Sequence, residues 1–130
     1  MTGLGGWVQA GLSFLNGDGN MKQGKIVRAY TELDKIKTRT DLPKETKLKL
    51  FEVRRKLRPF IDFQNEEQDA LEKKYAKLPS NEEHYAAYLK ELEEISNLEQ
   101  LFECEEVEVP MWDDVQIGMM EALDGFVKFV

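Results

Sequence analysis

Few side chains in this sequence are of the types that carry out catalysis or bind transition metals. His84 is the only histidine and Cys104 the only cysteine among the 130 residues, whereas a structural zinc site needs about four such ligands. None of the three serines lies in a motif that activates a nucleophile. The sequence therefore predicts a protein that is not an enzyme and that holds no cofactor, and we expect His84 to face solvent.

Carboxylates form the only dense groups of possible metal ligands outside the long helical patterns. Asp113 and Asp114 are adjacent, and Glu105, Glu106 and Glu108 follow one another closely. Such oxygens could hold a hard cation such as magnesium. Clusters of this kind are more often solvated, because nothing beside them in the sequence would tune a site. We therefore predict no metal site.

Composition indicates a folded, cytoplasmic protein. The chain is 42% apolar and 33% charged, which is too apolar for a disordered chain and fits one domain with long, surface-rich helices. A single cysteine suits a reducing compartment. No apolar run approaches the roughly 18 residues that a membrane span needs, so we expect no membrane association, and no motif indicates a small-molecule substrate.

Charge is divided unevenly along the chain. Residues 1–60 hold 13 Lys and Arg against 6 Asp and Glu, while residues 61–130 hold 5 against 19. Such asymmetry can indicate a nucleic acid or a basic partner. The simpler interpretation is that complementary charges meet inside one fold.

The first 20 residues differ from the rest of the sequence. They contain six of the nine glycines and no Lys or Arg, and glycine disfavours both helix and strand. We interpret residues 1–20 as a leader or as a segment upstream of a natural start at Met21, and residues 21–130 as a single helical domain.

Apolar periodicity predicts three helices. A three-and-four spacing runs through residues 25–39, and a longer stripe covers residues 43–78, with Pro59 inside it as the expected site of a kink. A third stripe begins after Ser80 or Asn81, either of which can cap a helix, and continues to about residue 103. The short connection predicts an antiparallel helical hairpin over residues 43–103.

The register of that hairpin places basic residues of the second helix beside acidic residues at the end of the third. We expect Arg54 to Arg58 to meet the acidic side chains Glu99, Glu103, Glu105 and Glu106. Exposed pairs of this kind contribute no more than about 1 kcal/mol each and act mainly on pairing and orientation.

A small lobe is expected over residues 104–130. Alternating valines at residues 106–109 predict a short strand, which would pair with residues 115–117 or with residues 126–130, with a short helix at 118–123 between them. The fold class is therefore mainly α: a long kinked helix, a partner helix, a shorter N-terminal helix and a strand/helix lobe.

Two groups of residues are candidates for binding a partner. Large aromatic and methionine side chains concentrate in the lobe, and such types are favoured at interfaces although most are core; they are Trp112, Met111, Met119, Phe126 and Phe129. Trp112 lies between a proline and two aspartates, so we expect it to be the exposed one. The second group is a basic patch formed by Lys47, Arg54, Arg55, Lys56 and Arg58. It lacks interleaved aromatic residues, which disfavours nucleic acid.

Three short motifs resemble a known family. They are Lys-x-Gly-Lys-Ile-Val at residues 22–27, Asp-Leu-Pro with a leucine seven residues further on at residues 41–50, and Glu-Val-Glu-Val-Pro at residues 106–110. On these motifs, residues 21–129 resemble a family of small proteins of unknown function from tailed phages and prophages of Gram-positive bacteria. The resemblance implies an accessory protein that acts in the host cytoplasm. Its role there would be in particle assembly or in counteracting a host system.

The leading hypothesis is a non-enzymatic phage or prophage accessory protein that binds another protein and that can form a homodimer. A second hypothesis is an inhibitor of a host defence or nucleic-acid-processing protein, whose acidic half imitates nucleic acid. A third is nucleic-acid binding through residues 44–58.

Overall fold

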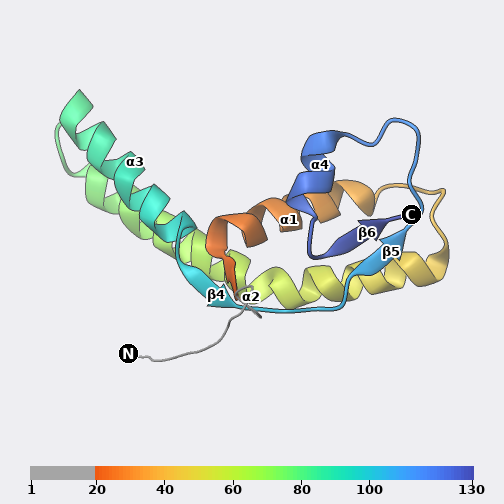
Figure 1. Cartoon of the computed structure of the whole chain (residues 1–130). Helices are drawn as coiled ribbons and strands as arrows, with labels where there is room; N and C mark the ends of the chain where they lie inside the picture. Colours follow the sequence, from red (N-terminus) through yellow and green to blue (C-terminus); the bar gives the residue numbers. More distant parts are fainter. Residues whose placement is uncertain (1–19) are drawn as a thin grey trace.

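One long central helix organises the fold. The computed structural model describes residues 20–130, and its longest element is α2, Lys44–Ala76. α1 (Gln23–Ile36) packs along the first half of α2 and α3 (Glu82–Ser96) along the second half, each antiparallel to it (Figure 1). The predicted mainly α fold with a long helix and a helical hairpin is therefore confirmed.

α2 changes direction about midway along its length (Figure 1), and Pro59 lies inside it. Proline has no N–H to donate to the carbonyl four residues earlier, and its ring clashes with that carbonyl. The bend that the sequence predicts is therefore present. It directs the second half of α2 and α3 away from the rest of the molecule.

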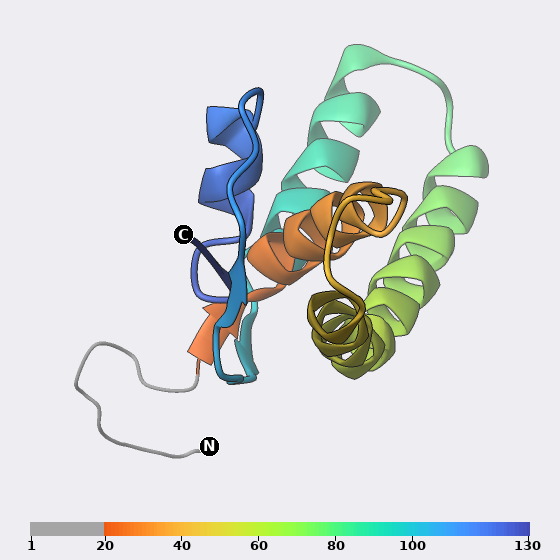
Figure 2. The same ribbon diagram turned by 90° about the vertical axis from the view of Figure 1, so that its right-hand side faces the viewer.

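The hydrophobic core lies between α1, the first half of α2 and the C-terminal lobe. In the view of Figure 2, α1 lies between the lobe and the hairpin of α2 and α3. The buried face of α1 has the predicted spacing, and the buried apolar residues of the two helices here are Ile26, Ala29, Leu33, Ile36, Leu50, Val53 and Leu57. Further along, in the second half of α2 and in α3, only Leu71 and Ile95 are buried. The hairpin is thus an extension of the core rather than its centre.

α3 ends at Ser96, well before its predicted end near residue 103. The chain continues as β4 (Glu99–Leu101), which pairs antiparallel with β3 (Asn20–Lys22). Ser96 and Asn97 are weak helix formers, and the backbone that follows them finds partners in β3 and in Gln23, whose N–H donates to the Leu98 carbonyl at 2.8 Å. The prediction of a helix through residue 103 is therefore wrong.

The lobe contains β5 (Val107–Val109), α4 (Ile117–Ala122) and β6 (Val127–Phe129). The predicted strand is confirmed, and its partner is the second of the two candidates, because β5 pairs parallel with β6. Parallel strands need a crossover connection, which α4 supplies. Gly125 precedes β6 with a φ of 92°, a conformation that residues with a Cβ rarely adopt.

A buried glutamine joins three elements of the fold. The side chain of Gln23 is 0% exposed, and its Nε2 donates to the Phe60 carbonyl at 2.8 Å and to Gln64 Oε1 at 3.2 Å. Its Oε1 accepts from Gln100 Nε2 at 2.9 Å. The start of α1, the middle of α2 and β4 are therefore held together by one satisfied polar network.

Candidate partner-binding groove on the hairpin arm

Residues 62–96 extend from the body of the protein (Figure 1), and we call them the hairpin arm. They comprise the second half of α2, the connecting turn and α3, which pack chiefly on each other. Apolar side chains on the arm remain largely in solvent: Leu78 is 40% exposed, Tyr85 63% and Leu89 45%. These residues continue the stripe that the sequence assigned to a hairpin core, but no described element covers them.

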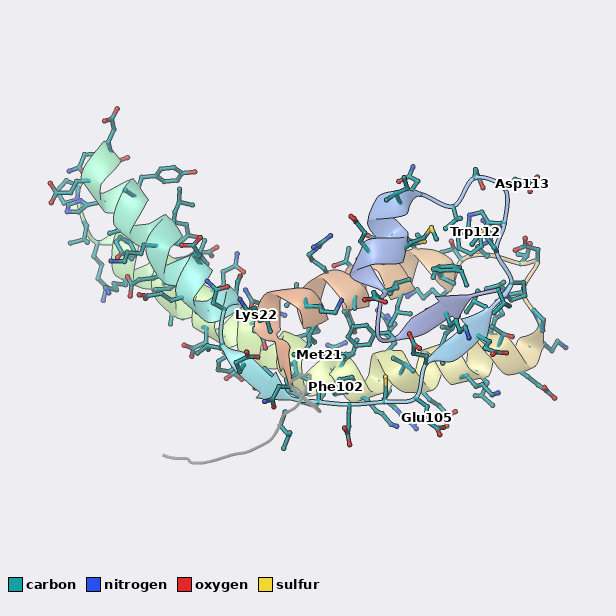
Figure 3. All side chains as sticks on the ribbon, in the orientation of Figure 1. Met21, Lys22, Phe102, Glu105, Trp112 and Asp113 are labelled. Atoms are coloured by element: carbon teal, nitrogen blue, oxygen red, sulfur yellow. The ribbon has the colours of Figure 1, made fainter. Side chains whose placement is uncertain are left out.

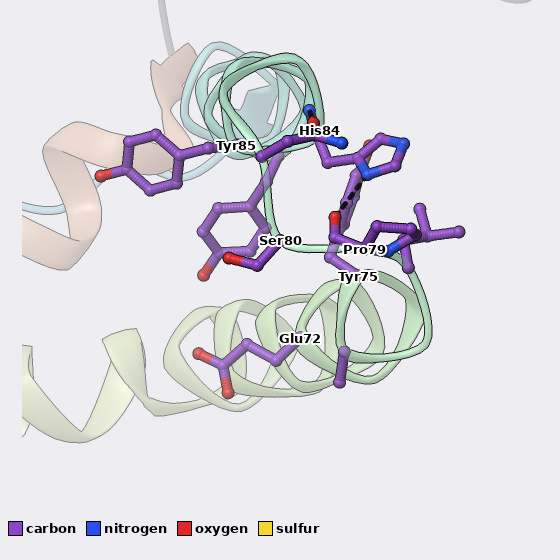
Figure 4. A pocket seen from close by; sticks show the side chains of 10 residues that line it. Glu72, Tyr75, Pro79, Ser80, His84 and Tyr85 are labelled. Carbon is purple, nitrogen blue, oxygen red and sulfur yellow. Dashed lines mark hydrogen bonds between the residues drawn. The ribbon is translucent and has the colours of Figure 1, made fainter.

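The turn of the arm is held by local hydrogen bonds. Asn81 caps α3, because its Oδ1 accepts from the backbone N–H of His84 at 2.8 Å. The His84 ring turns back over the turn, and its Nδ1 donates to the Pro79 carbonyl at 2.6 Å (Figure 4). This contact leaves His84 half-buried rather than fully solvated as the sequence predicted. Both bonds fix the angle at which α3 leaves the turn.

A groove of about 370 Å³ opens between the two helices at this end, and we call it the arm groove. Glu72 and Tyr75 enter it from α2, and Tyr85 and His84 extend from α3 above (Figure 4). Tyr88 also lines it and meets Tyr75 edge to face, with ring centroids 5.6 Å apart. The groove therefore combines aromatic walls with a carboxylate at its edge.

Glu91 ties the two helices of the arm together. Tyr75 Oη and Lys74 Nζ both donate to its carboxylate, the latter at 3.0 Å. The hydrogen bond from Tyr75 and then that from Lys74 lower the pKa of Glu91, while the same Tyr75 bond raises the pKa of the phenol. Glu91 therefore stays ionised and Tyr75 protonated near neutral pH, and the wall of the arm groove is held in place.

The arm groove is lined by side chains of the types that are common at contact surfaces. Its tyrosines have two rotatable side-chain torsions and present large amphipathic surfaces, which is typical of contact residues. Ser80 and His84 both line it, but the His84 Nδ1 is hydrogen-bonded to the Pro79 carbonyl, and no hydrogen bond among the described residues joins the Ser80 hydroxyl to a base. Across residues 20–130, no group of three His, Cys, Asp or Glu side chains is placed to hold a metal ion, and no helix is both long and apolar enough to cross a membrane.

Trp112 lies at the lobe end of the molecule, away from the hairpin arm (Figure 3). It is half-buried, because the Arg39 guanidinium lies 4.1 Å from its ring centre and Phe129 packs on it edge to face at 5.6 Å. The expectation of an exposed tryptophan is therefore wrong. Cation–π stacking and an aromatic neighbour cover the ring that the adjacent proline and aspartates were expected to leave in solvent.

The other lobe residues that the sequence analysis proposed as partner contacts differ in how deeply they are buried. Phe126 is 0% exposed and contacts Phe102 at 5.9 Å between ring centroids, so it belongs to the core and is not available to a partner. Met119 and Phe129 are half-buried against the core, and Met111 is 49% exposed. The structure therefore does not bring the five residues together as one exposed surface.

The basic patch is not neutralised in the way the sequence predicted. Arg54 pairs with Asp34 of α1 at 2.7 Å, and Arg58 with Asp62 one turn further on at 3.1 Å. Within the described part of the chain, no ion pair reaches Glu99, Glu103, Glu105 or Glu106. The predicted pairing is wrong because α3 ends early and the acidic residues leave on an extended segment.

Three basic residues of the patch remain without an ion pair among residues 20–130: Lys47, Arg55 and Lys56. Arg55 and Lys56 are exposed, and Lys47 is half-buried. The patch is therefore split: Arg54 and Arg58 pair with neighbouring carboxylates, whereas Arg55 and Lys56 face solvent.

Comparison with family models, with curated proteins and with solved structures finds no match for this chain. The arm groove itself escaped the sequence analysis, because its tyrosines have the spacing of a core stripe. One signal could have indicated it: Tyr85, Tyr88 and Leu89 lie close together near the start of the third helix, beside the turn and at the end of the hairpin far from the N-terminal helix.

Proposed function

We propose that this protein is a non-enzymatic accessory protein that binds another protein through its hairpin arm. A phage or prophage setting, with action in the host cytoplasm, is part of the proposal and comes from the motif resemblance alone. The arm supplies the interaction, and the body formed by α1, the first half of α2 and the lobe supports it.

The observation that carries the proposal is the apolar and aromatic surface of the arm. Tyr85 and Leu89 are one helical turn apart on α3 and exposed at 63% and 45%, and the arm groove lies beside them. Contiguous exposed apolar surface bordered by charge is typical of protein-binding sites. Two helices with a groove between them also suit an inserted helix or extended peptide.

Partner capture by an arm variant tests the proposal. The tagged wild type should capture a specific protein from extracts of the cells in which it is produced. We expect Tyr85→Ala/Leu89→Ala to capture at least about tenfold less of that protein, because exposed anchor residues dominate interface energies. Circular dichroism should stay unchanged, since neither side chain is buried.

The matched control is Leu101→Ala/Ile117→Ala. Leu101 and Ile117 are exposed at 80% and 74% and lie on the body rather than on the arm, so the control should capture like wild type. Equal loss in both variants, or full capture by the arm variant, would place the interface elsewhere.

A further inference from the structure

The outer face of α2 carries a stripe of basic and apolar residues at its start. Lys44, Leu48, Phe51 and Arg55 recur at three-and-four spacing, which places them on one side of the helix. We call these four residues the basic stripe. Leu48 is 59% exposed and Phe51 55%, and the Arg55 guanidinium lies 5.7 Å from the Phe51 ring centre. The stripe therefore presents two apolar knobs between two cations.

The hairpin arm has the opposite charge. Residues 62–96 contain ten Asp and Glu against four Lys and Arg. Asp69 and Glu72 lie one turn apart on α2, both exposed, and Glu72 lines the arm groove. Among the residues that the structure describes, neither these two acids nor Lys44 and Arg55 form an ion pair. Two complementary surfaces are thus left unpaired.

These two surfaces cannot meet within one molecule. Both lie on α2, which is one continuous helix, and even their nearest members, Arg55 and Asp69, are separated along it by about 21 Å at 1.5 Å per residue. The body keeps α1 packed against the first half of the helix. The basic stripe and the acidic arm can therefore contact each other only if they belong to two different molecules.

We infer that the arm groove of one copy binds the basic stripe of a second copy, with the two α2 helices antiparallel. Leu48 and Phe51 of one molecule enter the groove between the tyrosines of the other, and Arg55 faces Asp69 and Glu72. Lys44 lies 11 residues, about 16 Å, before Arg55 on α2, so it faces the acidic first turn of α3 at Glu82 and Glu83. The contact forms twice, related by a two-fold axis, so the assembly closes as a dimer. The inference rests on the proposed function, because it takes the arm groove as a protein-binding site, and it identifies a second copy of this chain as a protein that fits it.

A charge-swap experiment on the full chain tests this dimer by sedimentation velocity and light scattering. The wild type should be a dimer at about 50 mM salt and should weaken at least about tenfold at about 500 mM salt, where exposed charges are screened. Arg55→Glu and Asp69→Lys/Glu72→Lys should each be monomeric. An equimolar mixture of the two variants should restore a dimer, because each swapped surface then faces its complement.

Matched variants control for net charge. Arg28→Glu and Glu103→Lys/Glu105→Lys change the same charges at residues outside the stripe and the hairpin arm, and both should remain dimeric. All four variants replace residues that lie largely in solvent, so circular dichroism should show folded protein in each. A monomeric wild type at every salt concentration, dissociation of the controls, or a mixture that stays monomeric overturns the inference.

The two proposals fail in distinguishable ways. If the wild type is monomeric but the Tyr85→Ala/Leu89→Ala variant loses its captured protein, self-association is wrong and the proposed function stands. If the dimer behaves as described and the same variant captures all proteins as wild type does, binding of another protein through the arm is wrong.

Discussion

The buried glutamine offers a sharp test of how the fold is held together. Gln23→Leu keeps a side chain of similar size but removes all three hydrogen bonds that Gln23 makes with Phe60, Gln64 and Gln100. Each lost bond costs about 1 kcal/mol net, and a partner left unpaired in the interior costs more. We therefore expect the free energy of unfolding to fall by about 3 kcal/mol, a large part of the roughly 5 to 15 kcal/mol typical of a domain.

Urea unfolding followed by circular dichroism measures this change, and the melting temperature should fall by roughly 10 °C. Gln100→Ala removes one of the three bonds and leaves the buried Gln23 Oε1 unpaired, so it should cost about 1 to 2 kcal/mol, less than Gln23→Leu. The matched control is Gln116→Leu, an exposed residue whose side chain caps no helix, which should change stability by less than about 0.5 kcal/mol. A neutral or stabilising effect of Gln23→Leu would show that an apolar contact serves this position equally well and would refute the reasoning.

Two further predictions concern the lobe. Phe126→Ala should lower the free energy of unfolding by about 3 to 5 kcal/mol, because it opens a cavity at a fully buried ring. Met111→Ala, at a half-exposed position, should lower it far less. Similar losses for both variants in urea titrations would show that Phe126 does not belong to the core. Burial raises the pKa of Cys104, so less of it is thiolate at pH 8 than in an unfolded chain. Its alkylation by iodoacetamide, followed by mass spectrometry, should be at least about tenfold slower in folded than in urea-unfolded protein, and equal rates would contradict the burial seen here.

Local periodicity was sufficient to predict the helices and the lobe strand. The spacing of Ile26, Ala29, Leu33 and Ile36 identifies the buried face of α1, and it needs no knowledge of what packs there. Asn81 as the cap of α3 and Pro59 as the cause of a bend are likewise properties of a few neighbouring residues. The fold class followed from these signals because short connections bring consecutive helices side by side.

The candidate sites depended on contacts that no local pattern contains. A stripe such as Tyr85, Tyr88 and Leu89 has the same spacing whether a helix covers it or solvent does, so the arm groove appeared only with the tertiary structure. In the same way, the sequence makes Phe126 a candidate contact residue, and only the structure shows that Phe102 packs against it in the core.

Long-range pairing also decided where elements end and where charges meet. Residues 99–101, which the sequence predicts to be helical, pair as a strand with β3, although the two segments lie some 80 residues apart in the sequence. That change directs the following glutamates away from Arg54 and Arg58, which pair with Asp34 and Asp62 instead. Charge composition by itself determined that the two halves of the chain are complementary. Only the tertiary structure decided that the basic stripe stays in solvent, because the elements that pack on α2 cover its other faces and leave Leu48 59% and Phe51 55% exposed.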